Sequence, residues 1–239
     1  MKARLMGLLA LAVAVMAVAP AAKADAVGIS LWYSTNGTIW TNITTCSVAP
    51  VSPCAASNVA VGGTTITIGT VSATSNAPGT PGLSITQTEN LTIAGGASGG
   101  TFFLAEVAAG FTSPSSVQLF SSQSDSSSPG VDTYSTQVTG TLIAAGNLLN
   151  PGAPAVDACS AATDIITNVP SGNSNATVSC NGVTPFDLQT ISKVTIAAGS
   201  QVDLNTTVST SAVPEPASMA LFGSGLLGLA GVVRRKRAR

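Results

Sequence analysis

Short runs of alternating apolar and small polar residues recur through the middle of the chain. Ile66 and Ile68 alternate with threonine, and Val202 and Leu204 flank Asp203. Such alternation places apolar side chains on one face of a strand and polar ones on the other. The pattern predicts strands at Gly28–Tyr33, Thr64–Val71, Leu83–Ile93, Thr101–Val107, Val117–Phe120, Thr133–Ile143, Asn175–Cys180, Thr190–Ile196 and Val202–Val208. Half-buried strands of this kind predict an all-β protein, an antiparallel β-sandwich.

Turn-forming residues separate these runs. Pro78–Gly82, Gly95–Gly100 and Asn150–Pro154 are rich in glycine or proline, and Ser121–Gly130 reads as a serine-rich loop around Asp125. No fixed-period repeat joins the segments, which argues against a solenoid or propeller. The expected body is therefore one Ser/Thr-rich sandwich at residues 25–209, followed by a short linker at residues 210–212.

The first 24 residues predict a cleaved signal peptide. Lys2 and Arg4 precede an apolar run from Leu5 to Ala19, and Ala22-Lys23-Ala24 offers small residues where signal peptidase cuts. Removal after Ala24 is expected, with Ala26 as the second choice. The run is short for a membrane span, and nothing else in the chain is helical enough to pack against it as a core helix.

The last 27 residues contain three parts in a fixed order. Pro214-Glu215-Pro216 is a rigid, extended triplet, and residues 217–233 form an uncharged span of 17 residues, about 25 Å long as a helix. This length predicts one transmembrane helix. A basic cluster follows and is expected to stay cytoplasmic, which leaves the body outside. It consists of Arg234, Arg235, Lys236, Arg237 and Arg239.

This tail, residues 213–239, resembles the PEP-CTERM sorting signal of Gram-negative and related bacteria. The resemblance implies recognition of the triplet by an exosortase, a membrane enzyme that releases the protein to the cell surface or an exopolysaccharide matrix. The same tail is also known as an ice-binding protein C-terminal domain, a label that describes the tail and not the body. A plain C-terminal membrane anchor is the alternative interpretation.

Charge and the absence of histidine narrow the functions open to the body. Between residues 25 and 212 there are nine acidic residues and one basic residue, Lys193, so the net charge is near −8. Such a body repels nucleic acid. The chain has no histidine, which excludes Ser–His–Asp and Cys–His catalysis. No cofactor is predicted.

Export places the four cysteines where disulfides persist. Three connectivities are open to them, and we favour the local pairs, Cys46 with Cys54 and Cys159 with Cys180, because each closes a turn-rich segment. A metal site is not predicted, since neither a Cys-x-x-Cys motif nor histidine is present.

Two further groups of residues suggest chemistry. Trp32, Tyr33 and Trp40 cluster in a chain that is only 4% aromatic, and they could stack on a sugar ring or simply fill the core. The aspartates are scattered and are expected to be solvated loop residues. They are Asp125, Asp132, Asp157, Asp164, Asp187 and Asp203.

The sequence therefore predicts an exported, non-catalytic surface or matrix protein with a structural or adhesive role in a biofilm. Its expected partners are signal peptidase, an exosortase, the inner membrane during transit, and exopolysaccharide. A secreted carbohydrate-active enzyme that uses an Asp/Glu pair is the competing hypothesis. Such an enzyme needs two carboxyl groups about 5 to 9 Å apart in one cleft.

Overall fold

The computed structural model describes residues 28–47, 53–77, 83–112, 116–128, 130–146, 150–155, 159–181 and 185–212, together with Ser224. The signal peptide and the sorting tail, apart from Ser224, lie outside the described residues. Within the described part, no helix has the length and apolar character needed to cross a membrane. All strand neighbours are antiparallel, which confirms the predicted all-β sandwich.

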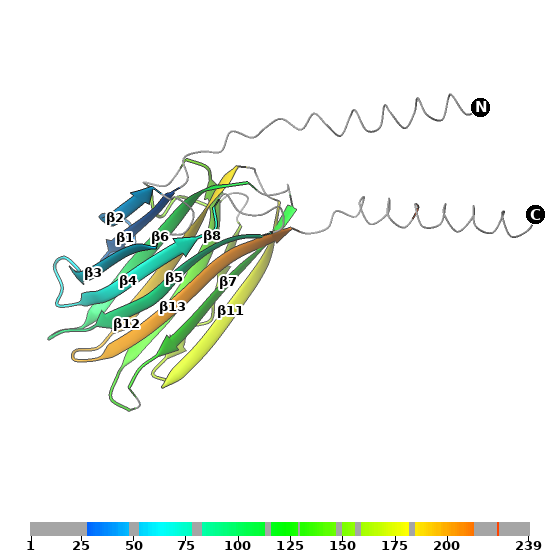
Figure 1. Cartoon of the computed structure of the whole chain (residues 1–239). Helices are drawn as coiled ribbons and strands as arrows, with labels where there is room; N and C mark the ends of the chain where they lie inside the picture. Colours follow the sequence, from blue (N-terminus) through cyan, green and yellow to red (C-terminus); the bar gives the residue numbers. More distant parts are fainter. Residues whose placement is uncertain are drawn as a thin grey trace, which may run out of the picture.

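Two sheets face each other (Figure 1). Sheet A contains, in spatial order, β10 (Ile166–Thr167), β8 (Tyr134–Ala144), β12 (Phe186–Ile196), β6 (Gly100–Phe111), β1 (Gly28–Ser34) and β2 (Thr41–Ser47), and β9 (Ser160–Ala162) also pairs with β8. Sheet B contains β11 (Ser171–Asn181), β7 (Ser116–Ser126), β13 (Gln201–Ala212), β5 (Leu83–Ala94), β4 (Thr67–Ser75) and β3 (Cys54–Ala60). The chain crosses between the sheets repeatedly, so most strands pair with partners distant in sequence.

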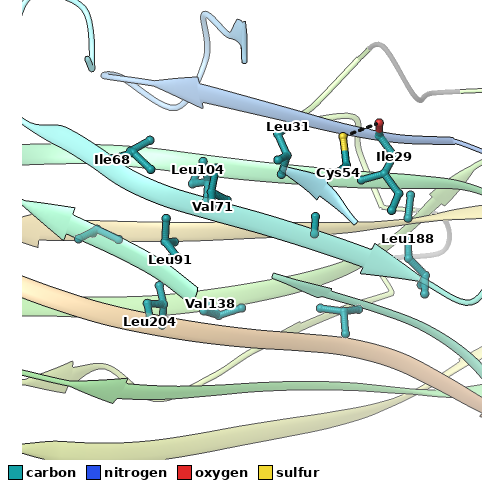
Figure 2. Packing of buried hydrophobic residues seen from close by; sticks show 14 of the residues in the cluster. Ile29, Leu31, Cys54, Ile68, Val71, Leu91, Leu104, Val138, Leu188 and Leu204 are labelled. Carbon is teal, nitrogen blue, oxygen red and sulfur yellow. Dashed lines mark hydrogen bonds between the residues drawn. The ribbon is translucent and has the colours of Figure 1, made fainter. Parts of the chain in front are cut away.

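The core lies between the sheets, where the alternating apolar residues of each inner face meet. Leu31, Leu104 and Leu188 of sheet A face Ile68 and Leu204 of sheet B, and all five side chains are almost completely buried (Figure 2). Alternation along each strand carries these side chains inward and their polar neighbours outward.

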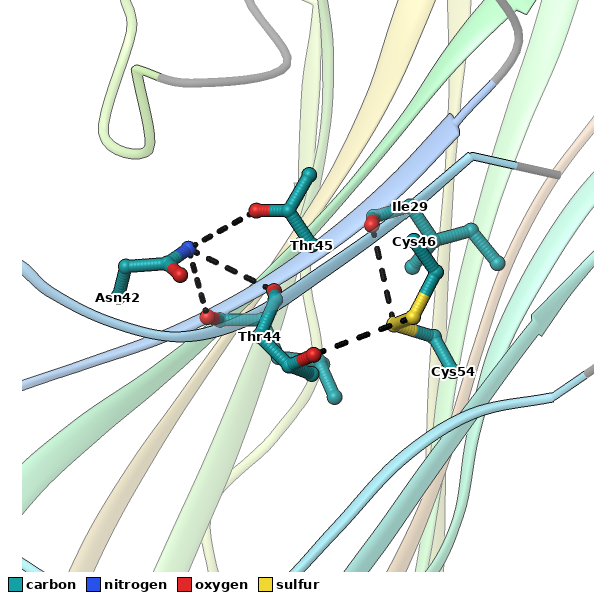
Figure 3. The surroundings of a disulfide bond; sticks show 7 residues. Ile29, Asn42, Thr44, Thr45, Cys46 and Cys54 are labelled. Atoms are coloured by element: carbon teal, nitrogen blue, oxygen red, sulfur yellow. Dashed lines mark hydrogen bonds between the residues drawn. A yellow bond between two sulfur atoms is a disulfide. The ribbon is translucent and has the colours of Figure 1, made fainter.

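Two disulfides join the sheets at opposite edges. Cys46 on β2 pairs with Cys54 on β3, with their Cα atoms 5.7 Å apart (Figure 3). Cys159, just before β9, pairs with Cys180 on β11, with a Cα separation of 5.5 Å. These are the local pairs favoured from sequence. Because each bond links an edge of sheet A to an edge of sheet B, the disulfides close both sides of the sandwich.

Three expectations about the chain's organisation were wrong. Residues 121–126 belong to β7 and not to a loop, because serine, glutamine and aspartate fill its inner face and hide the alternation. Residues 210–212 are not a linker, since β13 continues to Ala212 and Thr210 is buried. Strands β2 and β3 were not expected, because few apolar residues mark them.

Candidate functional site

The outer face of sheet A carries two of the three aromatic residues singled out in the sequence, and the first of them, Trp32, lies toward the end of β1. Leu31 is fully buried in the core, so alternation turns the half-buried Trp32 to the outer face. Tyr33 turns back to the inner side, where it packs against the core and its hydroxyl accepts a 3.3 Å hydrogen bond from the Gly62 N–H. Trp32 and Tyr33 therefore cannot contact one ligand.

Trp40 reaches the same outer face from the connection between β1 and β2. It is half-buried against the backbone of Gly152, where an added Cβ would lie 2.9 Å from the indole Nε1. The Gly152 N–H donates a 2.7 Å hydrogen bond to Oε1 of Gln189, which alternates with the core residue Leu188 on β12. Gln189 thus lies on the outer face, and it fixes the segment against which Trp40 packs.

Phe103 is an aromatic residue of this face that the sequence reasoning missed. Its neighbours Phe102 and Leu104 are in the core, so the half-buried Phe103 ring points outward. The ring lies against the turn after β1, where a Cβ added at Gly37 would meet Phe103 Cζ at 3.3 Å. The signal was present in the alternation of the predicted strand Thr101–Val107.

Loop residues cover another part of the outer face. Val107, Ile143 and Ala153 form a small apolar cluster separate from the main core. Val107 on β6 and Ile143 on β8 lie on either side of the intervening strand β12, while Ala153 comes from the connection after β8. We define the aromatic face as Trp32, Trp40 and Phe103 together with Gln189; it borders this covered region.

Three carboxylates are buried, and two of them, Asp125 and Asp187, were expected to be solvated loop residues. Glu106, which the sequence reasoning did not consider, faces inward from β6 and accepts hydrogen bonds from Thr86 and Thr88 of β5 in the opposite sheet. Both threonine side chains are buried as well. Asp187 is fully buried and accepts a 3.1 Å hydrogen bond from the Gly110 N–H.

Asp125 is the third buried carboxylate, and it joins the two sheets at the β7–β8 side. The Thr136 hydroxyl donates a hydrogen bond to its Oδ2, while Oδ1 is buried without a hydrogen-bond partner in the described part of the chain. Burial raises the pKa of Asp125 from 3.8 to about 6, and the Thr136 hydrogen bond opposes this shift. The side chain is 3% exposed, so this perturbed carboxyl is inside the sandwich and out of reach of a polymer.

A hollow of about 290 Å³ brings two other carboxylates together at the end of β7. It is lined by Ser126, Ser127, Ser128, Asp132, Gln201 and Asp203. Both oxygens of Asp132 accept backbone hydrogen bonds, from the Ser128 N–H at 2.7 Å and the Gln201 N–H at 2.8 Å. Asp132 therefore holds the loop to the start of β13. Asp164 is exposed elsewhere, and Asp157 lies outside the described residues.

A second hollow, of about 380 Å³, lies on sheet B and is lined by Ser124, Asp125, Ser126, Ser171, Gly172, Asn173 and Asn205. Asp125 contributes to this lining although its side chain is almost completely buried. Three of the lining residues, Ser124, Asn173 and Asn205, belong to three adjacent strands. Register places these three residues side by side on β7, β11 and β13. In the part of the chain that the structure describes, no group of three or more potential metal ligands is found.

The fold and site define a disulfide-bonded β-sandwich with an aromatic outer face, on which the exposed Lys193 is the register partner of Phe103. Residues 212–237 match the model of the PEP-CTERM protein-sorting motif, which confirms the predicted sorting tail. The motif indicates an exported protein that an exosortase handles at the cell envelope. The match begins at the last residue of β13, so the tail follows the sandwich directly.

Solved structures with a detectable likeness include several carbohydrate-binding modules. The TmCBM61 module, solved with β-1,4-galactotriose, is 8% identical, with 59% of this chain and 87% of the module covered and a TM-score of 0.32. The mannan-recognising module TmCBM27 is 12% identical, with 54% and 75% covered and a TM-score of 0.27. A family 11 module from Clostridium thermocellum is 9% identical, with 80% and 99% covered and a TM-score of 0.25.

These scores are too low to support any conclusion about a ligand. No curated protein matches the sequence.

Proposed function

We propose that this protein is a non-catalytic component of the cell surface or exopolysaccharide matrix, and that its aromatic face contacts polysaccharide. The observation that carries the proposal is the convergence of Trp32 and Trp40, from different positions in sequence, on one outer face of a sandwich that ends in a sorting motif. Tryptophan offers a large flat ring surface suited to stacking on a sugar ring. The Trp32 Nε1 atom is buried without a hydrogen-bond partner among the described residues, so the ring and not its N–H makes the contact. Oε1 of Gln189 already accepts a hydrogen bond from the Gly152 N–H, so the aromatic rings make the contact with the polysaccharide.

The delivery steps belong to the same proposal. The signal peptide is removed after Ala24, and residues 217–233 then hold the body at the inner membrane. The cluster from Arg234 to Arg239 remains cytoplasmic, in keeping with the positive-inside rule. Exosortase processing near Pro214-Glu215-Pro216 releases the body to the surface or matrix.

The positions of the carboxylates support a non-catalytic role. Glu106 and Asp125 are enclosed between the sheets, and Asp187 is covered on the outer face. In the hollow that holds Asp132 and Asp203, each oxygen of the Asp132 carboxylate accepts a backbone N–H. A glycosidase needs one carboxyl to donate a proton and the other to attack or to activate water, with both open to the substrate.

Polysaccharide binding by residues 25–212 tests the proposal, because every strand and both disulfides lie within this segment. Immobilised exopolysaccharide from the producing cells should retain this body, and Trp32→Ala or Trp40→Ala should weaken retention about tenfold, or about 1.4 kcal/mol. Tyr33→Phe is the matched control, since Tyr33 faces the other way. Equal binding by all four proteins would show that the aromatic face is not the site.

The competing enzyme hypothesis is tested with the same material. We expect no release of reducing sugar from the exopolysaccharide by the purified body. Hydrolysis that disappears in Asp203→Asn, with the fold preserved, would replace the adhesive interpretation by a catalytic one.

A further inference from the structure

Strand β11 forms one edge of sheet B in the part of the chain that the structure describes. Its 11 residues pair with β7 in an unbroken register from Ser171 to Asn181. Among the described residues, no strand pairs with its other side, and Figure 1 shows β11 at the border of the sandwich, opposite β3. Backbone N–H and C=O groups along that side are therefore available to a further strand.

This edge lacks the features that usually prevent strand addition. β11 contains no charged residue, no proline and no register shift. The other edge of sheet B is shorter: β3 has seven residues, follows Pro53 and is distorted at Asn58, whose φ is +54°. Natural sheets protect their edges with charges, proline, distortion or short strands, and β11 has none of these features.

The inner face of β11 is also incompletely covered. Ala176 and Val178 point toward the core but are only half-buried, whereas their register partners on β7, Ser121 and Leu119, are fully buried. The difference in burial arises because β7 has a neighbouring strand on both sides, whereas β11 has one on a single side. Burial of these apolar groups would stabilise a strand placed there.

Two exposed apolar side chains adjoin the same edge. Phe120, in register with Thr177 on β11, is 36% exposed, and Ile165 is 60% exposed. Ile165 lies beside β11, because the N–H of the preceding residue, Asp164, donates a 2.9 Å hydrogen bond to the Ser174 hydroxyl. Exposed apolar residues next to unpaired backbone indicate an interaction surface.

We infer that β11 pairs antiparallel with β11 of a second copy of this chain, so that sheet B continues through a two-fold axis. A strand placed across such an axis is its own complement, which is the arrangement of isologous dimers. The absence of charge on β11 favours self-pairing, because the body as a whole is near −8 and repels itself elsewhere. The inference is independent of polysaccharide binding.

A lysine pointing inward from an edge strand blocks strand addition while still reaching water in the monomer. Ala176→Lys places that charge at the middle residue of β11. Ala56→Lys is the matched control: it is also a half-buried inward alanine, on β3 at the opposite edge of the same sheet. Sedimentation velocity of residues 25–212 over a concentration series measures the dissociation constant of each form.

The wild-type body should dimerise, Ala176→Lys should raise the dissociation constant at least tenfold, and Ala56→Lys should leave it unchanged. A wild-type body that stays monomeric, or that Ala56→Lys disrupts instead, overturns the inference, as do longer oligomers. Hydrogen exchange of the wild type supplies a readout that does not depend on a variant's folding. Amides of β11 should become protected with rising concentration, while those of β3 should not; unchanged β11 exchange would count against the dimer.

Discussion

At the level of single residues, the inside of this sandwich is notably polar. Ser121, Gln123 and Asp125 succeed one another on the inner face of β7, and each has a buried side-chain atom without a hydrogen-bond partner in the described residues. A buried polar group without a partner costs about 1 to 3 kcal/mol of stability. These buried polar residues therefore offset part of the stability that the apolar core contributes.

The pKa of Asp125 makes stability depend on pH. Because burial raises this pKa to about 6 in the folded state, the folded protein holds the proton more tightly than the unfolded chain. The stabilisation that the protonated Asp125 provides is fully present below pH 3.8, the pKa of this group in the unfolded chain. It is lost as the pH rises through about 6, the pKa in the folded protein. Stability should therefore fall between pH 4 and pH 6.

We predict that Asp125→Asn removes this loss. The amide keeps the shape of the side chain without the charge, so the variant should be more stable than wild type at pH 7 by up to about 3 kcal/mol. Urea unfolding of residues 25–212 at pH 4 and pH 7 measures the change. Ser124→Asn, at the adjacent exposed position, should keep the wild-type pH dependence; a wild-type curve for Asp125→Asn would contradict the assignment.

At the level of elements, the edge strands explain why the cysteines are where they are. β2 and β3 are short and poorly marked by apolar residues, and the Cys46–Cys54 bond holds them together. On the other side, the Cys159–Cys180 bond ties the three-residue strand β9 to β11. Covalent links thus hold the two sheets together at both edges of the sandwich.

Removal of either disulfide should destabilise the body. Removal of Cys159–Cys180, which closes the longer loop, should cost more stability. Cysteines 8 and 21 positions apart close loops whose entropies differ by about 1 kcal/mol in the chain-entropy model, within a typical total of about 2 to 4 kcal/mol per bond. Denaturant unfolding of the double variants Cys46→Ser/Cys54→Ser and Cys159→Ser/Cys180→Ser compares them. A larger loss from the shorter loop would show that edge packing, and not loop entropy, dominates.

At the level of the whole molecule, the sandwich and the sorting tail are joined almost without a gap. β13 ends at Ala212, and the predicted span begins at residue 217, so only residues 213–216 lie between them. Four extended residues cover at most about 14 Å. In the proposed topology, the folded body lies close to the membrane during transit, and the exosortase acts within that short interval.

Replacement of Pro214-Glu215-Pro216 by three alanines should leave export intact, because the signal peptide is unchanged, but should retain the body at the inner membrane. The change removes both the rigid extended backbone and the carboxylate. Cell fractionation distinguishes the two locations, and Ser218→Ala, beside the triplet, serves as the control. Arrival of the triple variant at the surface with wild-type efficiency would identify the tail as an ordinary anchor.

The sequence by itself determined the features that local chemistry encodes. The sorting tail is a linear motif, so it can be recognised without knowledge of the fold. Strands with regular alternation, such as Val202–Val208, follow from the two-residue period of the extended backbone. The favoured cysteine pairs are those in the structure, because each is close in sequence.

Only the tertiary structure decided which residues meet. Glu106 and its threonine partners are 18 and 20 positions apart and come from opposite sheets, and a polar strand such as β7 gives no alternation that reveals its inner face. Trp32 and Trp40 share a face while Tyr33 does not, because the strand alternates and a separate loop brings Gly152 against Trp40. Whether a polar residue is solvated or enclosed depends on strand pairing over long sequence distances, which no local pattern specifies.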